Sequence, residues 1–227
     1  MPAVKAFLFD LDGLLADTEK IHMLAFAETA TRLGHKSEPK DYLSWIGHSS
    51  LDLGNWLAPR CGNTHTGQEI MDLEQQAFLE ILLREQPKPF SGAQDFFDTG
   101  DALGFQRALV SNTHYTLATA VLKVLLPHMN RSAEPESHFK HFATGDRVPK
   151  LKPSPAPYLS AAEKLGVSPG ECIAFEDSPA GATSAREAGC FVVAIPNIYL
   201  DPAAINKIAN VSFKTLKDAH TAKVWER

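Results

Sequence analysis

The sequence predicts an α/β protein in which a parallel sheet carries helices on both faces and an all-helical unit is inserted after the first strand. Two observations lead to this prediction. Short apolar runs alternate with helix-length segments after residue 90, whereas residues 19–86 contain no convincing strand. The length of 227 residues suits one domain that carries a sizeable insertion.

The apolar runs have the composition of buried strands. Most of them lack strict alternation of apolar and polar residues, as is typical of strands covered on both faces. After the first run, "FLFD", they span residues 105–111, 140–145, 172–177 and 190–196, with a weak edge strand at 210–215. The helix-length segments between them span residues 93–103, 115–126, 155–165 and 179–188. Because strand and helix alternate, we expect a Rossmann-like parallel sheet.

The inserted segment has a different pattern. In "QEIMDLEQQAFLEILLRE" the apolar residues recur at helical spacing, and the prolines of "QPKPFSG" cannot continue that helix. Asp17 and Thr18 offer capping side chains where the first inserted helix begins. We therefore expect an α/β core of residues 1–16 and 91–227 and a helical cap domain of residues 17–90. Three large side chains are expected in the core of this cap: Met23, Trp45 and Trp56.

Composition limits the classes of partner. Hydrophobic residues make up 44% and charged residues 22% of the chain, as in ordinary soluble globular proteins. The net charge of −5 gives no reason to expect nucleic acid or an anionic membrane as a partner. Neither a signal-peptide pattern nor an apolar run of membrane-spanning length is present, and Cys61, Cys172 and Cys190 are scattered. We therefore expect a cytoplasmic protein, and we take it to be a monomer.

Carboxylates gather where the expected strands end. Ligands of open parallel sheets bind outside the carboxyl ends of the strands, so the side chains there are candidates for a site. Carboxylate oxygens favour Mg²⁺, whereas a hydroxyl, a lysine and loop amides favour phosphoryl oxygens. The residues at these ends are Asp10, Asp12, Ser111, Asn112, Lys152, Glu176 and Asp177. They predict a site for Mg²⁺ and a phosphoryl group.

Four stretches, "DLDGLLADT", "LVSNT", "KLKPSP" and "FEDSPAG", resemble in order the motifs of the haloacid dehalogenase superfamily, in the branch with a helical cap after the first motif. The resemblance runs through almost the whole chain. It implies that Asp10 is the nucleophile that forms an aspartyl-phosphate, and that Asp12 protonates the leaving oxygen and later activates water. It further implies that Asp177, Asp10 and the backbone carbonyl of Asp12 hold Mg²⁺.

The resemblance also assigns the phosphate-binding residues, namely Ser111, Asn112 and Lys152. Lys150 is a rival to Lys152, which we prefer because a proline follows it, as in the family motif. Glu176 either binds the metal directly or positions the groups around the metal without contacting it. His22 stands one helical turn beyond Thr18, and a catalytic role for it is left open.

The acid at position 12 favours phosphate esters, because the dehalogenases and phosphonate-cleaving members of the superfamily lack an acid there. We expect a phosphatase acting on a small metabolite, with a phosphosugar mutase of the β-phosphoglucomutase type as the alternative. The segment "FATGDRVPKLKPSPAPY" looks most like that sugar-phosphate branch. However, Ser49 and Ser50 follow Gly47 where related caps carry an arginine that grips a second phosphate. This departure weakens the mutase and sugar-bisphosphate interpretations and leaves the substrate open. A binding protein without activity is the competing class, but every catalytic position of the motifs is filled.

Overall fold

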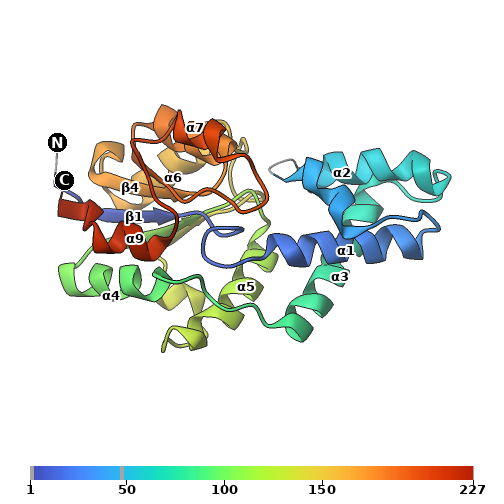
Figure 1. Cartoon of the computed structure of the whole chain (residues 1–227), viewed down its shortest axis with the longest axis horizontal. Coiled ribbons are helices and arrows are strands. Elements are labelled where there is room, and N and C mark those ends of the chain that lie inside the picture. Colours follow the sequence, from blue (N-terminus) through green and yellow to red (C-terminus); the bar gives the residue numbers. More distant parts are fainter. Residues whose placement is uncertain (1–2, 47–48, 227) are drawn as a thin grey trace. The chain divides into compact units, whose positions relative to one another are not determined.

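The computed structural model describes residues 3–46 and 49–226, and its elements are labelled in Figure 1. The chain forms two compact units, one of Met1–Ala16 with Lys88–Arg227 and the other of Asp17–Pro87. Residues 88–90, which we had expected in the helical segment, belong to the first unit. The reason is that Pro89 forms an antiparallel bridge with Ala16 and the amide of Phe90 donates to the carbonyl oxygen of Leu15 at 2.8 Å.

The first unit is built on a six-stranded parallel sheet in the order β3-β2-β1-β4-β5-β6. The strands are β1 (Ala6–Phe9), β2 (Gln106–Val110), β3 (His141–Ala143), β4 (Cys172–Glu176), β5 (Phe191–Ala194) and β6 (Val211–Ser212). The predicted fold class is confirmed. Because β1 lies between β2 and β4 and all three run in parallel, their carboxyl ends lie side by side. This end of the sheet is called its carboxyl edge below.

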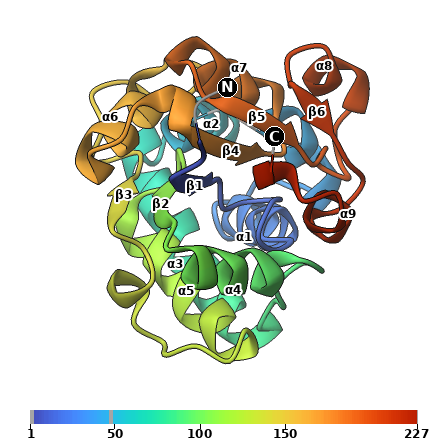
Figure 2. The ribbon, with the colours of Figure 1, turned by 90° about the vertical axis from the view of Figure 1, so that its left-hand side faces the viewer.

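Helices cover both faces of the sheet, with α6 and α7 on one side and α4 and α5 on the other (Figure 2). The helices of this unit are α4 (Ala93–Leu103), α5 (Tyr115–His128), α6 (Ala156–Leu165), α7 (Pro179–Ala188), α8 (Pro202–Asn206) and α9 (Leu216–Thr221). Short 3₁₀ helices are η3 (Pro135–Ser137), η4 (Pro169–Glu171) and η5 (Val224–Glu226). Successive strand residues point to opposite faces, so the β1 ring of Phe7 packs on Phe96 of α4 while Leu8 packs on the other face.

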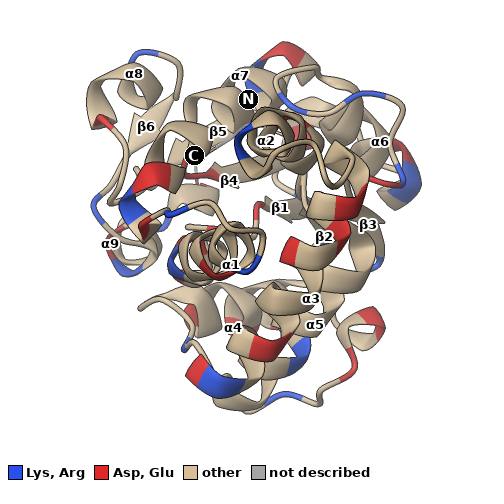
Figure 3. Ribbon diagram, turned by 90° about the vertical axis from the view of Figure 1, so that its right-hand side faces the viewer, with Lys and Arg blue, Asp and Glu red and all other residues tan. Residues whose placement is uncertain are grey.

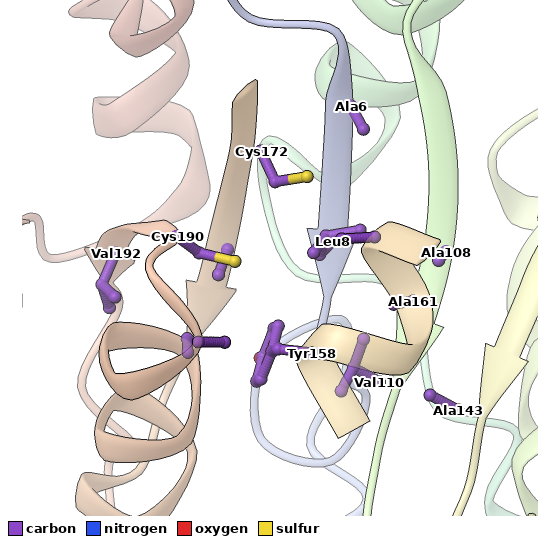
Figure 4. Close-up of a cluster of buried hydrophobic side chains, with 14 of the residues drawn as sticks. Ala6, Leu8, Ala108, Val110, Ala143, Tyr158, Ala161, Cys172, Cys190 and Val192 are labelled. Atoms are coloured by element: carbon purple, nitrogen blue, oxygen red, sulfur yellow. The ribbon is translucent and has the colours of Figure 1, made fainter. Parts of the chain in front are cut away.

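Small side chains on the α6 and α7 face let the helices approach the strands closely. Ala6, Ala108 and Ala174 of the strands meet Ala161 of α6 in one buried cluster. Tyr158 of α6 is the largest side chain of that cluster and is fully buried in it (Figure 4). A buried phenol needs a hydrogen-bond partner for its hydroxyl, and the Tyr158 hydroxyl donates to Glu176 at the end of β4.

The second unit contains helices and, among its described residues, no strand. Its elements are α1 (Glu19–Arg32), η1 (Pro39–Trp45), α2 (Ser50–Leu57), η2 (Ala58–Cys61) and α3 (Gly67–Glu85). Trp45 and Trp56 pack against the apolar cluster around Phe26, as the sequence predicted. Capping of α1 differs from the expectation. Asp17 accepts a hydrogen bond from the amide of Lys20 at 3.3 Å, whereas the side chain of Thr18 makes no capping bond.

Acidic and basic residues are interspersed along the helices of both units (Figure 3). Among the residues that the structure describes, no helix combines the length and the apolar character needed to cross a bilayer. All three cysteines are buried and form no disulfide.

Candidate active site

Three carboxylates meet at the carboxyl edge of the sheet. Asp10 follows β1, Glu176 ends β4 and Asp177 follows it, and one carboxylate oxygen from each lies within 4.8 Å of the others. All three side chains are buried. The register of β1 and β4 extends to these residues, since the amide of Asp10 donates to the carbonyl oxygen of Phe175 at 3.1 Å. Parallel pairing thus brings together residues that are far apart in the chain.

Lys152 enters this cluster from the loop after β3. Its Nζ lies 2.6 Å from Oδ1 of Asp10 and 2.5 Å from Oε1 of Glu176. The side chain is buried, whereas that of Lys150 is exposed. The structure therefore places Lys152, the preferred lysine, beside the expected nucleophile.

The electrostatics of the cluster favour a further cation. Burial raises the pKa of Asp10 well above its usual range; the Lys152 ammonium lowers it, and the carboxylates of Glu176 and Asp12 raise it further. Burial also disfavours the ammonium of Lys152, but the carboxylates of Asp10 and Glu176 outweigh that effect and raise its pKa. Within the described part of the chain, the Lys152 ammonium is the one cation paired with this cluster of three acidic side chains, and negative charge remains to be neutralised.

Asp12 is held by two hydroxyl groups of the loop after β2. Its Oδ2 accepts from Oγ1 of Thr113 at 2.7 Å and from Oγ of Ser111 at 3.4 Å. Oγ of Ser111 in turn accepts from the amide of Thr113 at 3.0 Å. The side chain of Asp12 therefore leans toward β2, whereas that of Asp10 contacts Lys152.

Asn112 contacts the backbone of Lys152 with both ends of its amide. Its Oδ1 accepts from the amide of Lys152 at 2.9 Å, and its Nδ2 donates to the Lys152 carbonyl oxygen at 3.3 Å. These bonds tie the loop after β2 to the loop after β3. The expected contact of Asn112 with a phosphate stays a prediction, and the structure adds that this side chain positions Lys152.

Glu176 is enclosed by three elements. Its Oε1 accepts from Nζ of Lys152 and from the hydroxyl of Tyr158. Burial raises the pKa of the Tyr158 phenol well above its usual range, and the Glu176 carboxylate raises it further. The other oxygen of Glu176, Oε2, is buried and has no hydrogen-bond partner among the residues that the structure describes. It lies against α7, since a Cβ atom added to Gly181 would lie 1.8 Å from it.

Asp177 is fixed by Asn197, which follows β5. Nδ2 of Asn197 donates to Oδ2 of Asp177 at 2.5 Å, and the amide of Asn197 donates to the Asp177 carbonyl oxygen at 3.0 Å. Gly13 packs directly against this pair with a φ of +75°, and a Cβ atom there would lie 2.2 Å from both side chains. Only glycine combines that backbone conformation with so close an approach.

Comparison with known families identifies the chain. Residues 4–189 match the family model of haloacid dehalogenase-like hydrolases. The chain belongs to this family. The hydrolase is also similar to protein CbbY of Rhodobacter capsulatus, with 32% identity over 204 residues that cover 86% of this chain and 87% of the relative. Hexitol phosphatase A of Escherichia coli is 32% identical over 207 residues, which cover 90% of this chain and 88% of that protein.

Solved structures share the fold of the hydrolase. CbbY from Rhodobacter sphaeroides in complex with phosphate superposes with a TM-score of 0.79 at 24% identity, covering 95% of this chain and 96% of that one. β-Phosphoglucomutase from Clostridium difficile superposes with a TM-score of 0.77 at 21% identity, covering 98% and 97%. The expected place in the sugar-phosphate branch of the superfamily is confirmed by relatives in sequence, among them hexitol phosphatase A.

Three residues of the site were not predicted from the sequence of the hydrolase: Thr113, Tyr158 and Asn197. Thr113 stands in the quoted motif "LVSNT", so its hydroxyl was visible there. Asn197 follows a strand at the same edge of the sheet, and the rule that selected Asp10 applies to it as well. Tyr158 gave no such signal, because its role depends on how α6 packs over β4.

His22, whose role the sequence left open, is buried in the helical unit of the hydrolase. Its Nδ1 lies 3.1 Å from Oε1 of Glu74 on α3, and its ring packs on Phe78 with the ring centroids 4.3 Å apart. The pair joins α1 to α3, so the structure gives His22 a role within the packing of its own unit.

Proposed function

We propose that this hydrolase is a magnesium-dependent phosphatase that releases phosphate from a small phosphorylated metabolite, a sugar phosphate, through an aspartyl-phosphate on Asp10. The observation that carries the proposal is the position of Asp10 within a buried carboxylate cluster and 2.6 Å from the Lys152 ammonium. The relative named hexitol phosphatase A supports the phosphatase class and the kind of substrate.

The donors present fit Mg²⁺, which prefers oxygen ligands and is commonly held by one or two carboxylates together with substrate phosphate. Asp10, Asp177 and the backbone carbonyl of Asp12 would hold the ion. Glu176 offers Oε2, to which no described residue donates a hydrogen bond. When bound, Mg²⁺ neutralises the negative charge of the carboxylates and of the phosphoryl group. Oε1 of Glu176 is committed to Lys152, so we assign to Glu176 the positioning of that lysine as well.

The residues of the chain divide the chemistry between them. A carboxylate oxygen of Asp10 attacks phosphorus, and the bond from phosphorus to the ester oxygen breaks. Asp12 gives its proton to the departing alkoxide and then takes a proton from water, whose oxygen attacks phosphorus and releases phosphate and Asp10. Lys152 and Ser111 stabilise the charge on the transferring group. The hydrogen bonds that Thr113 and Ser111 donate to one oxygen of Asp12 orient this carboxyl group.

The test is release of inorganic phosphate by the purified protein with Mg²⁺, first from p-nitrophenyl phosphate and then from a panel of hexitol, hexose and pentose phosphates. We expect turnover that EDTA abolishes and Mg²⁺ restores, with the highest kcat/KM on a sugar or sugar-alcohol phosphate. Asp10→Asn is the matched control. If the wild-type protein releases no phosphate from any member of the panel in the presence of Mg²⁺, the proposal is wrong.

The mutase alternative has no observation that favours it over hydrolysis. Ser49, at the place where related caps carry an arginine, is occupied in its own helix: its Oγ caps α2 by accepting from the amide of Asp52 at 3.1 Å. Gly47, two residues before Ser49, lies outside the described residues. The monomeric state, the cytoplasmic location and the lack of a nucleic-acid or membrane partner stay predictions.

A further inference from the structure

Asn197 is a buried neutral side chain that contacts the candidate active site with one end of its amide. It is 4% exposed. Its Nδ2 donates to Oδ2 of Asp177 at 2.5 Å, and its Oδ1 accepts from the amide of Tyr199 at 2.9 Å. An asparagine at a strand end usually serves to form a turn. Here the acceptor end of the amide forms the turn, and the donor end is left for Asp177.

The sheet brings Asn197 to Asp177. Strands β4 and β5 pair in parallel, and the ladder continues past the end of β5, where the amide of Ile195 donates to the Glu176 carbonyl oxygen at 2.8 Å. The next such bond joins the amide of Asn197 to the carbonyl oxygen of Asp177 at 3.0 Å. The backbone register therefore fixes the distance between the two side chains.

A neutral donor suits a carboxylate that must bind a metal cation, since a positively charged donor would repel that cation. The Lys152 ammonium at the other side of the cluster offsets the charge of Asp10 and Glu176, whereas the amide of Asn197 adds no positive charge beside Asp177. A hydrogen bond to one carboxylate oxygen limits rotation of the group, and outer hydrogen bonds of this kind orient the ligands of metal sites.

We propose that Asn197 is a positioning residue that holds the Asp177 carboxylate in the orientation in which it binds Mg²⁺. The inference rests on the proposed function, since it takes Asp177 as a ligand of that metal. It predicts that Asn197 sets the affinity for Mg²⁺ rather than the chemical step.

The experiment compares Asn197→Ser and Asn197→Ala by calorimetric titration with Mg²⁺ in the absence of substrate. A serine oxygen accepts from the amide two residues on, as the asparagine oxygen does, but its hydroxyl is too short to reach Asp177. Alanine removes both bonds. We expect Mg²⁺ binding to weaken about 10- to 100-fold in both variants. Ile198→Ala, which changes a neighbour that is 73% exposed, should bind as the wild type does.

Two further measurements separate positioning from a structural role. Asn197→Ser should remain folded and melt cooperatively without metal, and its kcat should recover at high Mg²⁺ concentration. Wild-type affinity in the folded serine variant, or a loss confined to the alanine variant, would overturn the inference. A crystal structure of the wild type with Mg²⁺ in which Asp177 has turned away from Asn197 would do the same. If the wild type binds no Mg²⁺, the proposed metal site itself fails, and the inference fails with it.

Discussion

The ammonium of Lys152 lies 2.6 Å from Oδ1 of Asp10, and both side chains are buried. A positive charge is thus in place beside the proposed nucleophile. Glu176 accepts a hydrogen bond from the Lys152 ammonium, and the side-chain amide of Asn112 accepts one from the Lys152 backbone. Such pre-organisation needs no rearrangement when a phosphoryl group arrives. It also makes the fold depend on the pair, because removal of one partner leaves buried charge without compensation.

Lys152→Met tests this dependence. We expect kcat to fall by about 10²- to 10³-fold, as when another preorganised donor of transition-state charge is removed. Without Mg²⁺, the free energy of unfolding should fall by about 3–5 kcal/mol. Phosphate release and urea denaturation measure the two effects. Lys150→Met, which changes an exposed lysine two residues away, should leave both values unchanged. Equal loss in the two variants would contradict the assignment of Lys152.

Gly181→Ala tests the position of Glu176 against α7. In an ordinary helix this substitution stabilises by about 1 kcal/mol, because alanine has the higher helix propensity. Here the added Cβ would lie 1.8 Å from Oε2 of Glu176, so the carboxylate must move away. We expect a net destabilisation of about 1–3 kcal/mol and a loss of activity. Thr183→Ala in the same helix is the control, since that hydroxyl donates to the carbonyl oxygen of Pro179 within the helix. Stabilisation by Gly181→Ala would show that Glu176 lies elsewhere.

Several residues of the site could be predicted because they follow an expected strand. Carboxylates and a lysine are rare next to buried strands, so Asp10, Asp177 and Lys152 could be selected by residue type and place in the chain. Asn197 occupies an equivalent place but was overlooked, because an asparagine after a strand has a common use as a turn former. Only the β4 and β5 register shows that its amide reaches Asp177.

Non-local packing explains what the sequence could not predict. The start of the α/β unit at residue 88 depends on the pairing of Pro89 with Ala16, across the whole helical segment. The contact of Tyr158 with Glu176 likewise depends on how α6 lies over the sheet. Helices with a regular apolar spacing, such as Gly67–Glu85, were predicted because their pattern is local.

The raised pKa of Asp10 predicts how Mg²⁺ binding depends on pH. Burial is the main cause, and it favours the protonated acid. Without metal, the folded state therefore retains a proton that the unfolded state has lost. This contribution to stability is complete below the usual carboxyl pKa and disappears as pH rises through the raised value. Because Mg²⁺ competes with that proton, its apparent affinity should rise with pH, by up to about tenfold per unit below the raised pKa.

Calorimetric titration of the wild type with Mg²⁺ at a series of pH values measures this effect. In Asp10→Asn the rise should be lost, because no proton is displaced at that position. An affinity that does not change with pH in the wild type would mean that Asp10 is already ionised throughout the range, and the prediction would be wrong.

Thr113 should matter through its hydroxyl, which donates to Asp12 at 2.7 Å. Thr113→Val keeps the shape of the side chain and removes that bond. We expect kcat/KM for a sugar phosphate to fall about 10- to 100-fold, the range for a lost hydrogen bond to a charged group. Thr113→Ser should restore most of the activity because it retains the hydroxyl. If serine and valine lose activity equally, the methyl group rather than the hydroxyl is what Asp12 requires.

Substitution of Asp10 and of Asp12 should affect different steps of the proposed reaction. Asp10→Asn removes the nucleophile, so turnover should drop to background and no phosphorylated protein should form. Asp12→Asn keeps the nucleophile and deletes the proton donor. The rate of the first step should then fall by about 10²- to 10⁴-fold for a sugar phosphate, whose alkoxide must be protonated, and much less for a nitrophenyl phosphate.

Loss of Asp12 should also slow breakdown of the aspartyl-phosphate for every substrate, because water then lacks its base. A good leaving group should therefore give a burst of nitrophenol equal to the enzyme concentration, followed by a stall, in Asp12→Asn. Rapid-quench kinetics with both kinds of substrate can resolve the two steps. Equal losses for the two leaving groups without a burst would mean that Asp12 acts mainly through its backbone and its hydrogen bonds to Ser111 and Thr113, rather than as acid and base.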